Sequence, residues 1–225
     1  MKNKKFTNTP KNNKWGSKKF KLIILAIFTV SLSAFAQDDS RNEIRIGPKV
    51  GFNKANIYDE SNEDFVADPK YGWAAGGFLS IPIGTYLGFH PEVMFSQKGF
   101  KGEGTFLGNE YKLERTTNYL DVPLLLAFKP TKNITLLAGP QFSYLLSRED
   151  KFTGFGINVA DEQEFENDNL KKNMMGGAFG LDVNINNLII GGRVSWDMQD
   201  NHGDGNSSTP NYKNMVLQAT VGLAF

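Results

Sequence analysis

Hydrophobic and polar side chains alternate along the end of the chain. One set of alternating positions is Met215, Leu217, Ala219, Val221, Leu223 and Phe225, and the other is Asn214, Val216, Gln218, Thr220, Gly222 and Ala224. Since successive side chains of a strand point to opposite faces, this segment predicts a strand with one apolar face and one small or polar face. A final strand that ends on Phe225, in a chain that begins with an export signal, points to the outer membrane of a Gram-negative bacterium.

The same alternation occurs in eight segments of the chain. They are residues 44–56, 70–81, 86–98, 111–128, 133–148, 171–185, 188–199 and 212–225. Each is long enough to cross a bilayer as a tilted strand, which takes roughly 9 to 11 residues. The pattern predicts an all-β fold, an eight-stranded antiparallel up-and-down transmembrane β-barrel.

The connections between these segments alternate between short and long. Residues 81–85, 129–132 and 186–187 are short and rich in turn residues, whereas 57–69, 99–110, 149–170 and 200–211 are long and rich in Gly, Asn, Asp and Glu. Membrane barrels have short periplasmic turns and long outer loops in this order. We therefore expect the four long connections to face outward from the cell.

The two faces of the strands differ in side-chain size. In the seventh segment, large apolar residues occupy one face, and the other face carries Arg193, Ser195 and Asp197; the third, fourth and sixth segments repeat this division. Small residues fit the crowded inside of a barrel, so the large apolar face is predicted to point outward into lipid. A soluble lipocalin-like barrel, with an apolar lumen and a polar exterior, is the alternative.

Aromatic residues on the predicted outer face fall near the strand ends. Trp73, Tyr144 and Trp196 lie toward the outer rim, and Phe128 and Phe225 lie toward the inner rim. Two such belts are typical of a protein that crosses a bilayer.

The beginning of the chain has the composition of a secretory signal. Eight lysines and no acid occupy residues 1–21, an apolar run follows at 22–30, and Ala34-Phe35-Ala36 precedes a predicted cleavage before Gln37. We expect a signal peptide over 1–36 and a barrel domain over 37–225, with a retained membrane anchor as the alternative.

Removal of that signal changes the charge of the protein. It leaves 17 basic and 24 acidic residues, a net charge of −7, which argues against nucleic acid as a partner. The chain has no cysteine, so it can form neither a disulfide nor a thiolate metal site.

Charged residues on the mixed face are the main candidates for chemistry. The positive residues are Arg45, Lys49, Lys98 and Arg193, and the negative ones are Glu92, Asp121, Asp182 and Asp197. An eight-stranded barrel is only wide enough to be filled by side chains, and buried charges persist when they are paired. The favoured interpretation is a structural ion-pair plug; a narrow ion pathway and a lumenal active site are the alternatives.

Three weaker patterns occur elsewhere. His90 is predicted to be lumenal, and His202 lies among the aspartates and serines of residues 200–208 without the spacing of a catalytic triad. Residues 200–206 faintly resemble a calcium loop but lack its closing glutamate. The connection at 149–170 is acidic with interspersed phenylalanines, which suits either a solvated loop or a protein-binding surface.

Four short motifs carry a family resemblance. KVGFN at 49–53, PEVMFSQKG at 91–99, YLDVPLL at 119–125 and AGP at 138–140 resemble the PorT-like outer-membrane β-barrel family of Bacteroidetes. The resemblance implies an eight-stranded barrel of the OmpX or OmpA type in the outer membrane. The family's founding member is associated with protein secretion and gliding, but fold does not establish function and no catalytic motif is carried over.

These observations favour a barrel that is not an enzyme, has no cofactor and is monomeric. We expect it to contact outer-membrane lipid and to act as a structural component or to bind a protein partner through its outer loops. The alternatives are a small porin-like channel, a component of a secretion apparatus and, more remotely, an enzyme that uses the outer rim.

Overall fold

The computed structural model describes residues 40–58, 66–106, 109–154, 157–164, 172–199 and 213–225. The chain divides into two compact units, Met1–Asp38 and Asp39–Phe225, and the first of them, with the predicted signal peptide, lies outside the described residues. Within the described residues, no helix is long and apolar enough to span a membrane.

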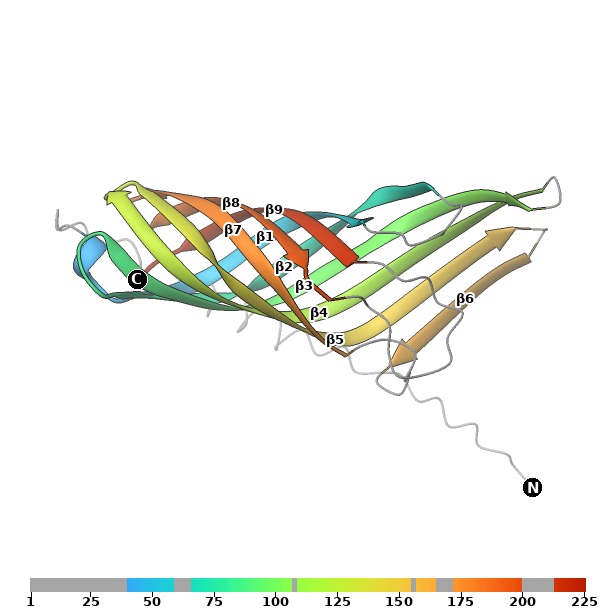
Figure 1. Cartoon of the computed structure of the whole chain (residues 1–225), viewed down its shortest axis with the longest axis horizontal. Helices are drawn as coiled ribbons and strands as arrows, with labels where there is room; N and C mark the ends of the chain where they lie inside the picture. The colour runs from blue at the N-terminus through green and yellow to red at the C-terminus, as the bar shows by residue number, and fades with distance from the viewer. Residues whose placement is uncertain (1–39, 59–65, 107–108, 155–156, 165–171, 200–212) are drawn as a thin grey trace, which may run out of the picture. The chain divides into compact units, whose positions relative to one another are not determined.

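The second unit contains a short 3-10 helix, η1 (Ser40–Asn42), and antiparallel strands. The strands are β1 (Arg45–Tyr58), β2 (Val66–Pro82), β3 (Leu87–Phe106), β4 (Asn109–Thr131), β5 (Ile134–Gly154), β6 (Ile157–Glu164), β7 (Asn173–Ile185), β8 (Leu188–Asp197) and β9 (Lys213–Leu223). Each of β1–β5 and β7–β9 pairs with its neighbours in chain order, and β9 pairs with β1 (Figure 1). These eight strands form a closed up-and-down ring, which confirms the predicted fold class.

The predicted short turns all lie at one end of this ring. Residues 83–86, 132–133 and 186–187 connect the strands there, next to the C-terminus of the chain (Figure 1). Asn186 has a φ of 54°, a left-handed conformation that asparagine tolerates better than most residues. A two-residue connection between β7 and β8 is therefore compatible with this sequence.

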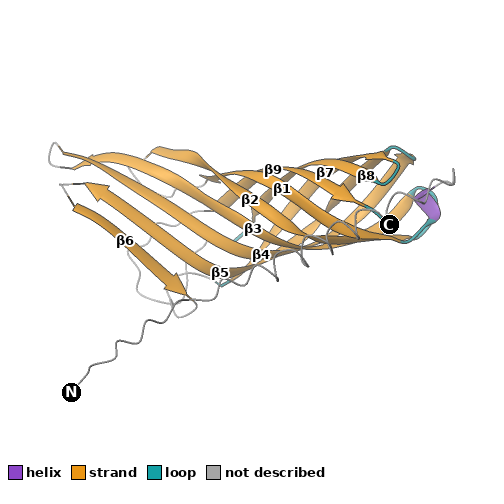
Figure 2. Ribbon diagram, turned by 180° about the vertical axis from the view of Figure 1, so that it is seen from behind, coloured by secondary structure: helices purple, strands orange, loops and turns teal. Residues whose placement is uncertain are grey.

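Two of the predicted outer loops are largely strand. Residues 99–106 and 109–110 continue β3 and β4, and residues 149–154 and 157–164 form the end of β5 and all of β6 (Figure 2). The prediction of loops there was wrong because their polar composition resembles that of a loop, whereas charged residues can also pair across strands. Arg115 opposite Asp150 is one such pair.

Strand β5 has two partners along the same edge. Its first part, residues 134–144, pairs with β7, and residues 147–154 pair with β6. The ring therefore closes only along residues 134–144 of β5. Beyond these residues, β3, β4, β5 and β6 continue as a sheet. We call this sheet, residues 99–118 and 147–164, the outer extension.

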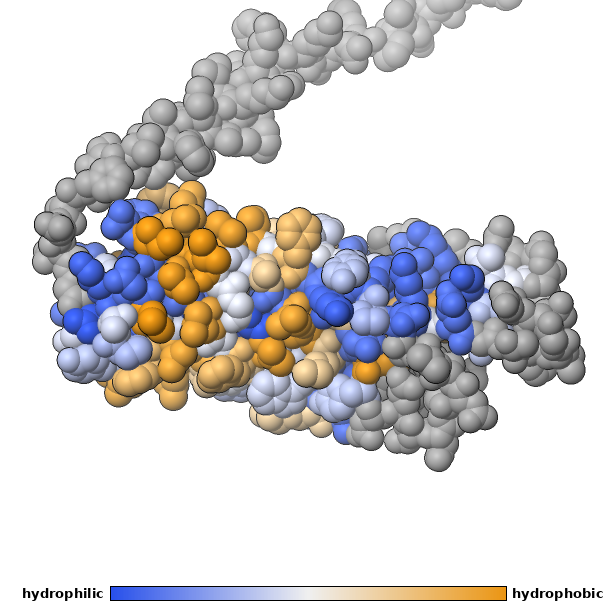
Figure 3. Space-filling model, turned by 90° about the horizontal axis from the view of Figure 1, so that it is seen from above, coloured by the Kyte–Doolittle hydropathy of each residue, from blue (hydrophilic) through white to orange (hydrophobic). Residues whose placement is uncertain are grey.

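The outer face of the ring is apolar. Val93, Leu126, Phe179 and Leu217 are each more than half exposed, while alanines such as Ala74, Ala127 and Ala178 are buried on the inner face. Figure 3 shows apolar residues gathered around the middle of the barrel on one side, with hydrophilic residues toward both ends. The predicted orientation of the two faces is confirmed, and the soluble-barrel alternative does not fit this exterior.

Candidate functional site in the barrel lumen

The carboxylate of Glu92, on β3, lies at the centre of a group of buried charges. Its Oε1 and Oε2 accept hydrogen bonds from Nη2 and Nη1 of Arg193, both at 2.7 Å. Lys49 Nζ lies 2.9 Å from Oε1 and 3.4 Å from Oδ2 of Asp182. His90 Nε2 lies 3.0 Å from the same Oε1. Glu92 is therefore held by three side chains that come from β1, β3 and β8.

This group spans the lumen rather than one side of it. In the ring order β1-β2-β3-β4-β5-β7-β8-β9, strands β3 and β8 are four positions apart, which places them on opposite walls. The bidentate Arg193–Glu92 pair thus crosses the full width of the barrel. An arginine-carboxylate pair of this kind fixes both side chains in position as well as neutralising their charge.

A second group of polar side chains lies beside the first. Lys98 Nζ is 2.9 Å from Oδ1 of Asp121 and 3.3 Å from the hydroxyl oxygen of Ser143. The Ser143 hydroxyl donates to the same Asp121 oxygen at 2.6 Å. Together the two groups join three cations to three carboxylates.

The remaining two predicted charges have other partners. Arg45 Nη2 donates to the backbone carbonyl of Asn186 at 2.7 Å, and Asp197 Oδ2 accepts from the side-chain amide of Asn214 at 2.6 Å. All eight predicted residues are buried inside the ring. The structure brings six of them into ion pairs and places Arg45 and Asp197 near opposite ends of the lumen.

Several neutral residues of this lining were not part of the predicted ion-pair network. Asn53 donates to Ser96 Oγ at 2.9 Å and accepts from Gln218 at 2.8 Å, so a hydrogen-bonded row also joins β1, β3 and β9. These residues occupy the same inward positions as the charges. The alternation places Gln218 on the small or polar face of its strand, but it does not identify the partners of Gln218.

Glycines leave room for this packing. A β-carbon on Gly191 would lie 2.3 Å from Oδ1 of Asp182 and 2.6 Å from the hydroxyl oxygen of Thr220, whereas one on Gly192 would meet nothing within 4 Å. Gly191 is buried in the lumen wall and Gly192 faces outward. The Asp182 carboxylate therefore requires a residue without a side chain at position 191.

The predicted aromatic residues all lie exposed on the outer face. Trp73, Tyr144 and Trp196 are 36 to 47% exposed, and Trp73 stacks on Phe95 with ring centroids 4.8 Å apart. Phe225 exchanges backbone hydrogen bonds with Ile46 at the end of the ring that carries the short turns.

The outer extension contains ion pairs of its own. Arg115 Nε donates to Oδ1 of Asp150 at 2.8 Å and its Nη2 to Oδ2 at 2.9 Å, while Arg148 lies 3.0 Å from the same carboxylate. On the outer side of this sheet a hydrogen bond from Lys70 lowers the pKa of Glu114 from its ordinary value. Asp150, predicted to lie in an acidic loop, is thus a paired strand residue.

Three sequence predictions fall outside the described residues. His202 with its neighbouring aspartates and serines, the calcium-like segment 200–206 and the acidic stretch 165–168 all lie there. Among the residues that the structure describes, no group of three or more His, Asp or Glu side chains is arranged to hold a metal ion.

A closed antiparallel ring with an apolar exterior and a charged interior defines an integral membrane β-barrel. The chain belongs to the family of the outer membrane protein beta-barrel domain, whose model matches residues 35–203. The protein is accordingly one of the outer membrane of Gram-negative bacteria, where it sits in the lipid bilayer.

Solved structures of similar fold include small outer-membrane barrels. Ail, the attachment invasion locus protein of Yersinia pestis, solved with the heparin analogue sucrose octasulfate, is 13% identical with a TM-score of 0.47, covering 81% of this chain and 99% of its own. Neisserial surface protein A is 12% identical with a TM-score of 0.41, covering 81% and 97%. OprG of Pseudomonas aeruginosa is 14% identical with a TM-score of 0.35, covering 81% and 94%. No curated protein matches the chain by sequence.

Proposed function

We propose that the protein is a structural or protein-interaction component of the outer membrane, with a lumen closed by ion pairs. The Arg193–Glu92 pair across the barrel is the observation that carries this proposal. An ion entering the lumen would have to separate this pair and leave buried charges uncompensated, which costs several kcal/mol. The protein belongs, in this proposal, with the PorT-like barrels, is exported by a cleaved signal peptide and is monomeric.

Single-channel recording in planar bilayers tests the closed lumen. We expect no stable conductance steps from the refolded parent protein, with a large porin recorded under the same conditions as a positive control. Stable steps from the parent would refute the plug and favour the porin-like alternative.

The outer extension is the proposed interaction surface. Its outer side presents charged groups to water, among them the Lys112–Glu103 pair at 2.8 Å and the Lys151–Glu149 pair at 2.9 Å, with side chains that are 39 to 63% exposed. Exposed strands that project beyond the bilayer can contact a partner without disturbing the ring below them. The proposed activity is binding, with no catalytic step.

Affinity capture from outer membranes tests this surface. A variant that lacks residues 152–168 loses the tip of β5 together with β6, and a control variant with a shortened β3–β4 hairpin loses a similar amount of the neighbouring tip. We expect a specific partner to be captured by the parent and the control but not by the first variant. Equal capture by all three would show that the β5–β6 hairpin is not the binding surface.

A further inference from the structure

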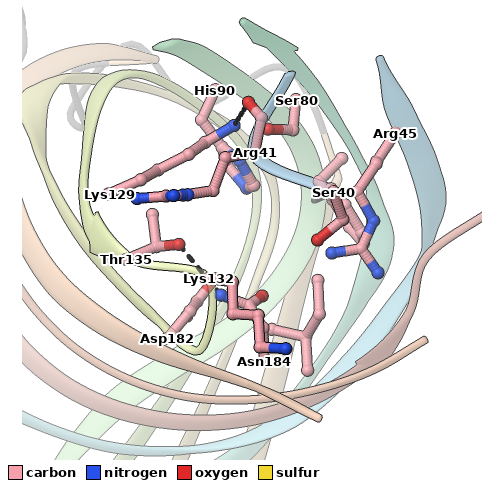
Figure 4. Close-up of a pocket in the computed structure, with 12 residues that line it drawn as sticks. Ser40, Arg41, Arg45, Ser80, His90, Lys129, Lys132, Thr135, Asp182 and Asn184 are labelled. Atoms are coloured by element: carbon pink, nitrogen blue, oxygen red, sulfur yellow. Dashed lines mark hydrogen bonds between the residues drawn. The ribbon is translucent and has the colours of Figure 1, made fainter. Parts of the chain in front are cut away.

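The end of the lumen that carries the short turns holds a small basic recess. Its wall includes Arg41 next to β1, Arg45 at the start of β1, Lys129 near the end of β4 and Lys132 in the β4–β5 turn (Figure 4). We call these four residues the basic mouth. Four cations from two segments of the chain, residues 41–45 and 129–132, thus surround one opening.

Two of these cations are buried. Arg45 and Lys129 are 9% and 5% exposed, and Lys129 Nζ donates to the backbone carbonyl of Arg41 at 3.2 Å. Arg41 in turn lies over the ring of Tyr86, 5.3 Å from its centroid. These contacts hold η1 against the mouth and keep its charges near one another.

Two of these cations, Arg45 and Lys132, are not paired with an acid that the structure describes. Asp182 is the acidic residue among those that line the recess, and it is already 3.4 Å from Lys49. Glu43, two residues before Arg45, is exposed, and its charge acts on Arg45 from more than 4.0 Å away. Among the described residues, the ion pairs within 4.0 Å include neither Arg45 nor Lys132, and Arg45 uses one nitrogen on the backbone of Asn186. An arginine with five donors retains capacity for an acceptor that carries negative charge.

Neutral groups complete the lining. Thr135 Oγ1 accepts a hydrogen bond from the Asn184 amide at 2.9 Å, which leaves the Thr135 hydroxyl proton available for another acceptor, and Ser80 supplies a second hydroxyl (Figure 4). The space within the recess measures about 20 Å³, room for about one water molecule. A larger ligand would therefore sit among the side chains of the mouth, with at most one of its atoms in the recess.

We propose that the basic mouth binds an oxoanion of the phosphate class on the periplasmic side of the outer membrane. Guanidinium and ammonium groups together with hydroxyl donors are the usual ligands of phosphate oxygens in proteins. Two sources share this chemistry, a soluble phosphate of the periplasm and the phosphate of a phospholipid headgroup in the inner leaflet. The inference does not depend on whether the lumen above the recess conducts.

Calorimetric titration of the refolded barrel with inorganic phosphate, in non-ionic detergent at low salt, tests the soluble source. The variant Arg45→Gln with Lys132→Gln removes two charges of the mouth, and the control Lys112→Gln with Lys151→Gln removes two exposed charges of the outer extension. We expect phosphate to bind at least about tenfold more weakly to the first variant, since a charge-assisted contact contributes about that factor or more. The control should bind as the parent does.

Nanodiscs test the lipid source. Barrels in phosphatidylcholine nanodiscs with and without phosphatidylglycerol are compared for the number of anionic lipids that remain bound in native mass spectrometry. Retention by the parent and the control, but not by the mouth variant, supports a headgroup as the ligand even where free phosphate does not bind.

The proposal fails if neither phosphate nor phosphatidylglycerol distinguishes the mouth variant from the outer-extension control. A mouth variant that does not refold, judged by the far-ultraviolet spectrum and by its migration before heating, is replaced by Lys132→Gln alone. Lys132 is exposed, so its substitution does not disturb the packing of the lumen.

Discussion

Replacement of Glu92 by glutamine tests the ionic interior most directly. The substitution keeps the shape of the side chain but removes the negative charge that faces Arg193 and Lys49. Glu92 is 1% exposed, so water cannot replace the negative charge that the substitution removes. Asp182 would remain as the carboxylate within reach of Lys49, and the guanidinium of Arg193 would face an amide.

The size of the effect follows from this burial. Removal of one partner from a buried ion pair costs about 3–5 kcal/mol. For a domain of this length such a loss lowers the unfolding temperature by on the order of 10 °C. We expect that shift in the temperature at which the folded form disappears on gel electrophoresis, with no new conductance in planar bilayers.

A surface substitution provides the matched control. Glu103 forms an exposed pair with Lys112, with side-chain exposures of 59% and 63%, so Glu103→Gln removes the same charge where water can replace it. Exposed pairs contribute about 0–1 kcal/mol, and we expect almost no shift from this variant. An unfolding temperature that falls equally in both variants, or in neither, would refute a stabilising role for the buried pair.

Three further predictions concern single positions. Gly191→Ala should lower the free energy of unfolding by about 1–3 kcal/mol because its β-carbon meets a carboxylate and a hydroxyl, whereas Gly192→Ala, with open space outside, should be neutral in the same chemical unfolding assay. Lys70→Gln should raise the pKa of Glu114 toward its ordinary value of 4.5, as followed by NMR titration; because the native pKa is lowered, the stabilisation is present above pH 4.5 and is lost as the pH falls through the native pKa. Asp150→Asn should loosen the pairing of β4 with β5 in the outer extension, because Asp150 bonds to Arg115 on β4, and amide hydrogen exchange should become faster in residues 111–118 and 147–154 with an unchanged melting temperature of the ring; slower or unchanged exchange would contradict the third prediction.

The alternation of side chains was sufficient to predict the ring and the direction of its two faces. A strand that must expose apolar side chains to lipid has one allowed register, since a shift by one residue would turn every charge outward. Leu188, Ile190 and Trp196 were predicted to face outward on that basis and do so. The apolar outer face is thus a property that local sequence determines.

The partners within the lumen could not be predicted in the same way. The alternation identifies Glu92, Lys98 and Arg193 as inward-facing, but it does not say which of them lie at the same height. That depends on the register of every strand around the ring and on bulges such as the shift at Asn118/Tyr119. Glu92 therefore pairs with a residue 101 positions away, across the barrel, and not with Lys98 on its own strand.

The outer extension shows why composition misleads where the bilayer ends. Inside the membrane the lipid requires apolar side chains on one face, so a strand there has a clear sequence pattern. Beyond the membrane both faces contact water or each other, and the strands are held by pairs such as Arg115–Asp150 and by the stacked rings of Tyr111 and Phe152, 6.0 Å apart. Charged strands of this kind have the composition of loops.

The contrast between these regions indicates where the protein can vary without losing its fold. Lipid constrains the outer wall, and the need to pair buried charges constrains the lumen, so a substitution in either has a large cost. The exposed side of the outer extension and the exposed residue Lys132 of the basic mouth carry neither constraint. Lys112, Lys151 and Lys132 are exposed, and nothing in the packing of the ring requires a charge at these positions. A contact with another molecule would give these exposed charges a role that the ring does not, so the proposed partner and the proposed oxoanion are assigned to these two ends of the barrel.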